Sequence, residues 1–176
     1  SPFLLVMSMQ DPEINIIKTD LAKIVTGVQE LWGNGTPIRF ILRPEGDRDS
    51  KLLSEYFPGL RNAMAKARLS RGIPVAVTEQ DAIDLAENTV GSLTASTLTT
   101  ILSEHRNLQP IAIEGVKPTL ANLENGSYGL SKSLYLVLGP AATRAARDFI
   151  QFVLSPHGGA VLRRLGNIPA ANPVGE

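Results

Sequence analysis

A dense run of charged residues stands where a short apolar stretch gives way to a helical pattern. Arg43 follows the apolar stretch 38–42, and the charged run continues to Ser50. A guanidinium can grip two oxygens of a small anion at once, and the free amides and dipole of a helix start favour negative charge. Asp47 and Asp49 allow a second interpretation, in which one of them caps the helix and pairs with Arg43. The sequence leaves both chemistries open.

Residues that support catalysis are few. Of the two histidines, His105 lies in a polar run and His157 follows Pro156, and neither has metal-ligand spacing to another histidine. The chain contains no phosphate-binding P-loop and no Gly-x-Ser-x-Gly nucleophile elbow, and its Gly33-x-Gly35 lacks the third glycine of a dinucleotide loop. We therefore expect a protein that is not an enzyme and that uses no cofactor and no metal.

The composition is that of an ordinary globular chain. Its 176 residues are 43% hydrophobic and 19% charged, which is enough to bury a core. The 17 basic residues balance 17 acidic ones, so the net charge favours neither nucleic acid nor an anionic membrane surface. The absence of cysteine excludes disulfides and is compatible with an oxidising compartment. Any anion site must therefore be local.

Short runs of branched apolar residues alternate with helical patterns along the chain, which is typical of an α/β domain. We expect strands at residues 3–8, 38–42, 75–77, 91–95, 110–113 and 134–138. We expect helices at residues 19–27, 47–57, 60–69, 79–87, 96–104, 119–124, 141–154 and 156–165. Thr19 should cap the first helix, and Thr78 with Asp81 resembles a capping box.

The run IEGVKPTLANLENGSYGLSKSLY at residues 113–135 carries a more specific pattern. Three other stretches occur with it in a fixed order: DLAKIVTG at 20–27 with a nearby tryptophan, Arg43 after a strand, and FIQFVLS at 149–155 followed by Gly158, Gly166 and Pro169. Together they closely resemble phosphate-type periplasmic solute-binding proteins with the type 2 PBP-like fold. The resemblance implies a three-layer αβα lobe with a mixed sheet.

The resemblance also implies a ligand site at the charged run. In that family an arginine after a strand, followed by small hydroxyl and glycine residues at a helix start, holds the oxyanion. Arg43 and Ser50 are the closest matches. The intervening residues 44–49 depart from the usual Ser-Gly-Thr and place carboxylates where the oxygens of an anion would lie, which is repulsive in a partly dry cleft.

A second contact in that family comes from a glycine-containing strand end that faces the cleft. The matching stretch here contains Ser92 and Thr94, and Thr94 stands where a second glycine is common. The predicted ligand-binding set is therefore Arg43, Asp47, Arg48, Asp49, Ser50, Ser92 and Thr94.

Solute-binding proteins of this kind close two lobes around a ligand, and their chain passes from lobe one to lobe two and back. The first residues of this chain resemble the crossing strand, so we expect lobe two at residues 1–130. Residues 131–176 should form a return strand and C-terminal helices that pack on a lobe one that is largely absent. Their uncovered apolar faces near Phe149 and Phe152 favour a homodimer or an exchanged arrangement.

The function implied is capture of phosphate or a related small oxyanion outside the cytoplasm, in the periplasm or its equivalent, for an ABC permease or a membrane receptor. The apolar first residues lack the basic region and cleavage site of a signal sequence, which would therefore lie outside this chain. The alternative is a regulatory or interaction domain on the same fold. Because half of the ligand shell would be missing, we expect weak or absent oxyanion binding.

Overall fold

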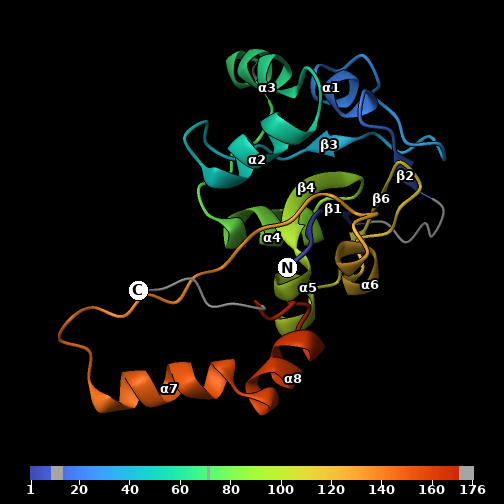
Figure 1. The fold of residues 1–176 in the computed structure, drawn as a ribbon. Helices are drawn as coiled ribbons and strands as arrows, with labels where there is room; N and C mark the ends of the chain where they lie inside the picture. The colour runs from blue at the N-terminus through green and yellow to red at the C-terminus, as the bar shows by residue number, and fades with distance from the viewer. Residues whose placement is uncertain (9–13, 71, 171–176) are drawn as a thin grey trace.

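The computed structural model describes residues 1–8, 14–70 and 72–170. Its fold is α/β, with a mixed β-sheet and helices around it (Figure 1). The four-stranded sheet has the order β3-β4-β1-β5, formed by Arg39–Phe40, Ser92–Thr97, Phe3–Met7 and Gln109–Pro110. β1 runs antiparallel to β4 and β5, whereas β3 runs parallel to β4. A separate parallel pair joins β2 (Asn15–Ile16) to β6 (Ala112–Ile113). The prediction of a mixed sheet is confirmed.

Helices cover both faces of this sheet, which gives the predicted three-layer αβα arrangement (Figure 1). On one side lie α1 (Asp20–Val25), α2 (Arg48–Tyr56) and α3 (Leu60–Leu69). On the other side lie α4 (Glu79–Glu87) and α5 (Leu98–Ser103). The chain then forms α6 (Leu120–Glu124), α7 (Arg144–Leu154) and α8 (Pro156–Arg164).

The strand β1 separates two apolar cores. All five of its residues are fully buried, because successive side chains of a strand point to opposite faces and both faces are covered. Phe3, Leu5 and Met7 pack into the core under α1, α2 and α3. Leu4 and Val6 pack into the core under α4 and α5. A continuous apolar run with no polar alternation is what this doubly covered position requires.

The sequence predicted the bounds of two helices and the capping motif of one of them correctly. α3 and α4 begin and end at the expected residues. Thr78 and Asp81 form both reciprocal bonds of the capping box, so two backbone donors at the start of α4 are satisfied. The predicted cap at Thr19 is wrong, because its backbone is already helical and its side chain makes no capping bond.

The predicted strand at residues 134–138 is wrong. Ser131 forms a single bridge to Pro2, and residues 132–139 then have no regular secondary structure. Apolar and aromatic residues favour a strand, but within the described residues no neighbouring strand pairs with this segment, and its side chains are exposed: Leu134, Tyr135, Leu136, Val137 and Leu138. The short strand expected at 75–77 is likewise reduced to one bridge, between Val75 and Leu42.

The first residues of the chain lie beside residues 130–132. The amide of Phe3 donates to the carbonyl of Leu130 at 3.1 Å, and the amide of Lys132 donates to the carbonyl of Ser1 at 3.0 Å. The buried Tyr128 hydroxyl donates to the carbonyl of Phe3 at 2.9 Å. The chain therefore leaves the body of the fold from a fixed position, immediately after Lys132.

α7 and α8 lie apart from the sheet and pack against each other (Figure 1). Phe149 and Phe152 on α7 remain 56% and 45% exposed, so the apolar surface expected there is present. The end of α8 is held to the body by an ion pair of 2.6 Å between Arg163 and Glu124. Within the part of the chain that the structure describes, no helix has the length and apolar character needed to cross a membrane.

Gly91 fixes the entry into β4. Its φ of +75° lies in the left-handed region, and a Cβ at this position would meet the carbonyl oxygen of Pro37 at 2.1 Å. Its own carbonyl accepts hydrogen bonds from the Arg39 amide at 2.9 Å and from the Trp32 indole at 3.1 Å. The close approach of the two backbones therefore requires glycine.

Replacing Gly91 with alanine should lower the free energy of unfolding by at least about 2 kcal/mol, because the methyl group adds a backbone clash to an unfavourable φ. Urea denaturation measures this change. Gly33→Ala is the matched control, since a Cβ at Gly33 would meet no atom within 4 Å, and it should shift the free energy by less than about 0.5 kcal/mol. Equal effects of the two substitutions would contradict this account.

Candidate functional site

Arg43 lies on the segment that continues from β3, four residues before Asp47, the N-cap of α2. Its Nη2 donates to the Asp47 carboxylate at 2.8 Å, and its Nη1 donates to the carbonyl of Ala76 at 3.2 Å. Only 11% of the side chain is exposed. The guanidinium is therefore held in place, and its buried Nε–H has no partner among the described residues.

Asp47 is the N-cap of α2. Its backbone is extended, and its Oδ1 accepts a hydrogen bond from the amide of Asp49 at 2.9 Å, while its Oδ2 binds Arg43. The cap satisfies one of the free amides of the first turn, and the carboxylate also suits the positive end of the helix dipole. Of the two chemistries that the sequence leaves open, the structure shows the one in which Asp47 caps the helix and pairs with Arg43.

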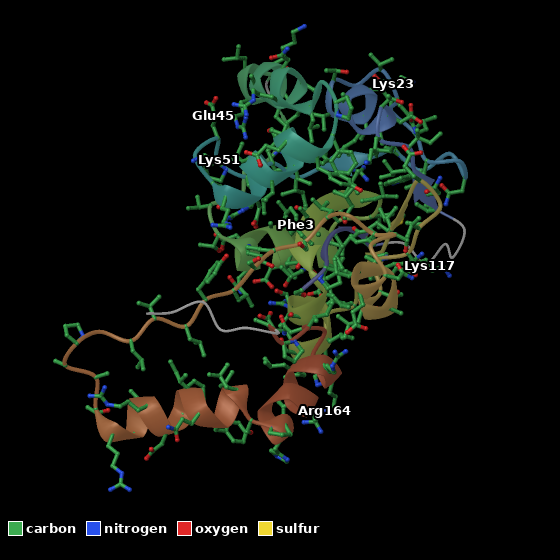
Figure 2. All side chains as sticks on the ribbon, in the orientation of Figure 1. Phe3, Lys23, Glu45, Lys51, Lys117 and Arg164 are labelled. Atoms are coloured by element: carbon green, nitrogen blue, oxygen red, sulfur yellow. The ribbon has the colours of Figure 1, made fainter. Side chains whose placement is uncertain are left out.

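Ser50 is buried in the first turn of α2 and faces the loop rather than solvent. Its hydroxyl donates to the carbonyl of Arg43 at 3.3 Å and lies 3.3 Å from Nη2 of Arg68, which also donates to the Arg43 carbonyl at 2.9 Å. Three other charged side chains around this helix start face outward. Arg48 is exposed. Figure 2 shows Glu45 on the loop before α2 and Lys51 on the first turn of α2. Both lie at the outer edge of the molecule, on the side opposite Lys117.

A second group of charges lies beside the start of α2. The carboxylate of Asp49, a residue that is only 3% exposed, binds Nζ of Lys132 at 2.7 Å. Lys132 also lies 3.5 Å from Glu79, whose other oxygen accepts hydrogen bonds from the hydroxyls of Ser96 and Thr100. One ammonium therefore serves two carboxylates, one at the start of α2 and one at the start of α4.

Burial and the shared ammonium act in opposite directions on the ionisation of Asp49. Burial raises the pKa of the Asp49 carboxyl, although hydrogen bonding and attraction to Lys132 act against it. Burial also opposes the charge on Lys132, but its bonds and attraction to Asp49 and Glu79 outweigh that effect and raise the pKa of the ammonium. Hydrogen bonds from Thr78 lower the pKa of Asp81, and the charge of Arg43 acts in the same direction. The carboxylates at the two helix starts, those of Asp49, Glu79 and Asp81, therefore lie close to the positive charges of Lys132 and Arg43.

Ser92 and Thr94 lie on β4, the strand whose Ser96 contacts Glu79. Both are fully buried, and their hydroxyls donate to backbone carbonyls, that of Ser92 to Ala86 at 2.8 Å and that of Thr94 to Ile41 at 3.3 Å. The structure therefore brings Arg43, Asp47, Asp49 and Ser50 together around one helix start, and it places the two β4 side chains in the interior.

Sequence reasoning missed Lys132, Glu79 and Arg68. Lys132 belongs to the run that carries the resemblance, but nothing in its spacing links it to a carboxylate so far away in the sequence. Glu79 was recognised only as the first residue of a helix. A buried aspartate in a first turn does require a partner, and this need was the one available signal.

A hollow in the described part of the molecule lies elsewhere. Its volume is about 290 Å³, and the residues around it are Ile14, Asn15, Ile16, Asp20, Ile24, Gln29, Trp32 and Gly33. These residues include one carboxylate and no lysine, arginine or histidine, so the hollow offers no cation to an oxyanion. The start of α2 remains the better candidate.

Replacing Lys132 with methionine should lower the free energy of unfolding by about 2 to 3 kcal/mol at neutral pH, because the buried Asp49 carboxylate loses its cation. Lys23→Met removes a more exposed pair with Asp20 and should cost less than about 1 kcal/mol.

The loss of stability caused by Lys132→Met should be smaller at acidic pH. The folded state already holds the Asp49 proton more tightly than the unfolded chain, so the favourable contribution of that proton is present at low pH and is lost as the pH rises through the raised pKa. Without Lys132 the pKa rises further. Chemical denaturation over a pH series measures the difference in the free energy of unfolding between the unmodified chain and Lys132→Met. This difference should become smaller as the pH falls toward 3.8, the ordinary carboxyl pKa. A difference that does not change with pH would contradict this assignment.

Solved structures of similar fold come from several bacteria. A protein assigned as a phosphate ABC transporter substrate-binding protein, with bound phosphate, from Clostridium perfringens superimposes with a TM-score of 0.77 and 17% identity, over 96% of this chain and 68% of that chain. PstS from Borrelia burgdorferi gives a TM-score of 0.61 and 20% identity, over 95% of this chain and 68% of that one. At these identities the likeness shows the fold.

Curated relatives point the same way over part of the chain. The phosphate-binding protein PstS 2 of Streptococcus agalactiae serotype V is 26% identical over 104 residues, which is 58% of this chain and 32% of that protein. This chain thus matches about a third of the length of that relative. A family model described as the PBP superfamily domain matches residues 1–157. Because that match covers most of the chain, the chain belongs to the PBP superfamily.

Proposed function

We propose that this chain is the ligand-binding lobe of an extracytoplasmic solute-binding protein that captures phosphate or a related small oxyanion for an ABC importer or sensor. The observation that carries the proposal is the placement of Arg43. Its guanidinium binds Asp47, the N-cap of α2, and is largely buried, with its Nε donor unused among the described residues. A fixed guanidinium beside the first turn of a helix is an arrangement suited to a small oxyanion.

The related proteins support this class of ligand. The names of the streptococcal relatives specify phosphate binding, and the name of the similar protein from Clostridium perfringens specifies phosphate transport. They give no support to a regulatory module without a transport role. In this proposal Arg43 and the first turn of α2 contact the ligand, whereas Ser92 and Thr94 contribute by joining β4 to its neighbours. The role is binding and requires no catalytic group.

We further propose that residues 1–130 form lobe two and that residues 131–176 include the elements that pack on another lobe. Two observations support this division. The segment 134–138 exposes five consecutive apolar side chains, and the adjacent α7 exposes Phe149 and Phe152. The chain also covers only 68% of the similar structure from Clostridium perfringens. Several exposed apolar and aromatic side chains in one region of the chain are typical of an interface.

Arg43→Gln should abolish oxyanion binding. Because one lobe supplies only part of the ligand shell, the unmodified chain should bind phosphate in the millimolar range or more weakly, with shifts of the backbone amide resonances of residues 48–50. NMR titration with phosphate measures both. Arg144→Gln, at a side chain that is 94% exposed, should leave the titration unchanged. Equal phosphate binding by Arg43→Gln and the unmodified chain would overturn the assigned site.

The exposed α7 face should make the isolated chain self-associate. Sedimentation velocity at increasing concentration should detect dimers or larger species, and joint replacement of Phe149 and Phe152 by serine should return the chain to a monomer. The matched control replaces two other exposed apolar residues, Leu69 and Val77, which are 88% and 71% exposed. A wild-type chain that stays monomeric at every concentration would refute this expectation.

A further inference from the structure

The carboxylate of Asp47 occupies the donors that a small anion would need. One of its oxygens accepts from the Arg43 guanidinium at 2.8 Å, and the other accepts from the Asp49 amide in the first turn of α2 at 2.9 Å. A guanidinium and a first-turn amide are also the donors that an oxyanion at this helix start would use. The chain therefore already contains an anion at the position of its own candidate site.

This internal anion is difficult to displace. Asp47 belongs to the same short segment as Arg43 and caps the helix, so its carboxylate competes as a tethered group at high effective concentration. A free ligand must also replace the capping bond when it removes the carboxylate. The competition is therefore built into the covalent structure of the site.

The surrounding charges disfavour an additional anion. The starts of α2 and α4 carry Asp47, Asp49, Glu79 and Asp81, and the ammonium of Lys132 is already shared between two of these groups. Phosphate brought beside Arg43 would add negative charge to a region that already holds these carboxylates, of which Asp49 is buried and Asp81 exposed.

We propose that Asp47 is the residue that determines oxyanion affinity. Its carboxylate takes the place of the ligand, binds Arg43 and thereby weakens phosphate binding. The inference rests on the proposed function, because it assumes that Arg43 is the anion-binding group. A ligand can bind the Arg43 guanidinium only if it displaces the Asp47 carboxylate.

The decisive variant is Asp47→Ser. Serine is also a good N-cap, so α2 keeps a capping side chain while the carboxylate is removed. Calorimetric titration with inorganic phosphate should show binding at least about tenfold tighter than that of the unmodified chain, because both the competitor and a nearby negative charge are gone. Thermal unfolding, followed by circular dichroism, verifies that the variant is folded.

Asp148→Ser is the matched control, because it removes a carboxylate from another Arg–Asp pair spaced i,i+4, on the exposed surface of α7. It should leave phosphate affinity unchanged. The double variant Arg43→Gln with Asp47→Ser should lose the gain, which shows that the tighter binding requires the guanidinium.

The outcomes separate this inference from the proposed function. Tighter binding by Asp47→Ser alone, lost in the double variant, supports both. Equal phosphate affinity of the unmodified chain and Asp47→Ser overturns the role of Asp47 and leaves the oxyanion site in place. Absence of phosphate binding in every variant, folded Asp47→Ser included, overturns the oxyanion function itself and this inference with it.

Discussion

The antiparallel pairing of β1 with β4 is the contact on which the other elements depend. Both strands are buried along their whole length, so each needs an apolar or hydrogen-bonded environment on two faces at once. β1 supplies apolar side chains to both cores, whereas β4 carries hydroxyl residues whose polar groups bind neighbouring backbone and side-chain atoms. β4 also holds β3 in parallel register. The position of Arg43, just beyond β3, is thus a consequence of a pairing made far from it in the sequence.

The same acidic residues serve stability and limit the site. Carboxylates at the starts of α2 and α4 satisfy free amides and suit the helix dipoles, and Lys132 offsets the desolvation of Asp49. Each of these stabilising interactions adds negative charge near the guanidinium best placed to bind an anion. A chain with small hydroxyl residues at these positions would have weaker local pairing and a more open anion site. Stability of the helix starts and affinity for an oxyanion are therefore in opposition here.

The sequence predicted those features that depend on neighbouring residues. The bounds of α3 and α4 and the capping box of Thr78 follow from local pattern and hydrogen bonding, and the structure confirms them. Features that depend on distant partners were missed or wrong. Residues 134–138 have strand composition, yet no adjacent strand pairs with them in the described structure. The pairing of Lys132 with Asp49 joins remote segments and has no spacing signal. The sequence located Arg43 after a strand, but whether its guanidinium faced a carboxylate depended on the conformation of the following turn.

The segment from residue 133 to residue 155 is held at both ends. At one end, Lys132 and the backbone bonds to Ser1 fix the point where the chain leaves the body. At the other end, the close approach of Gly166 to Leu98 and the Arg163–Glu124 ion pair return α8 to the body. A segment tied to the body at two points has fewer accessible conformations than an arm that is free at one end. This restriction lowers the entropy cost of ordering its apolar surface when a partner covers it.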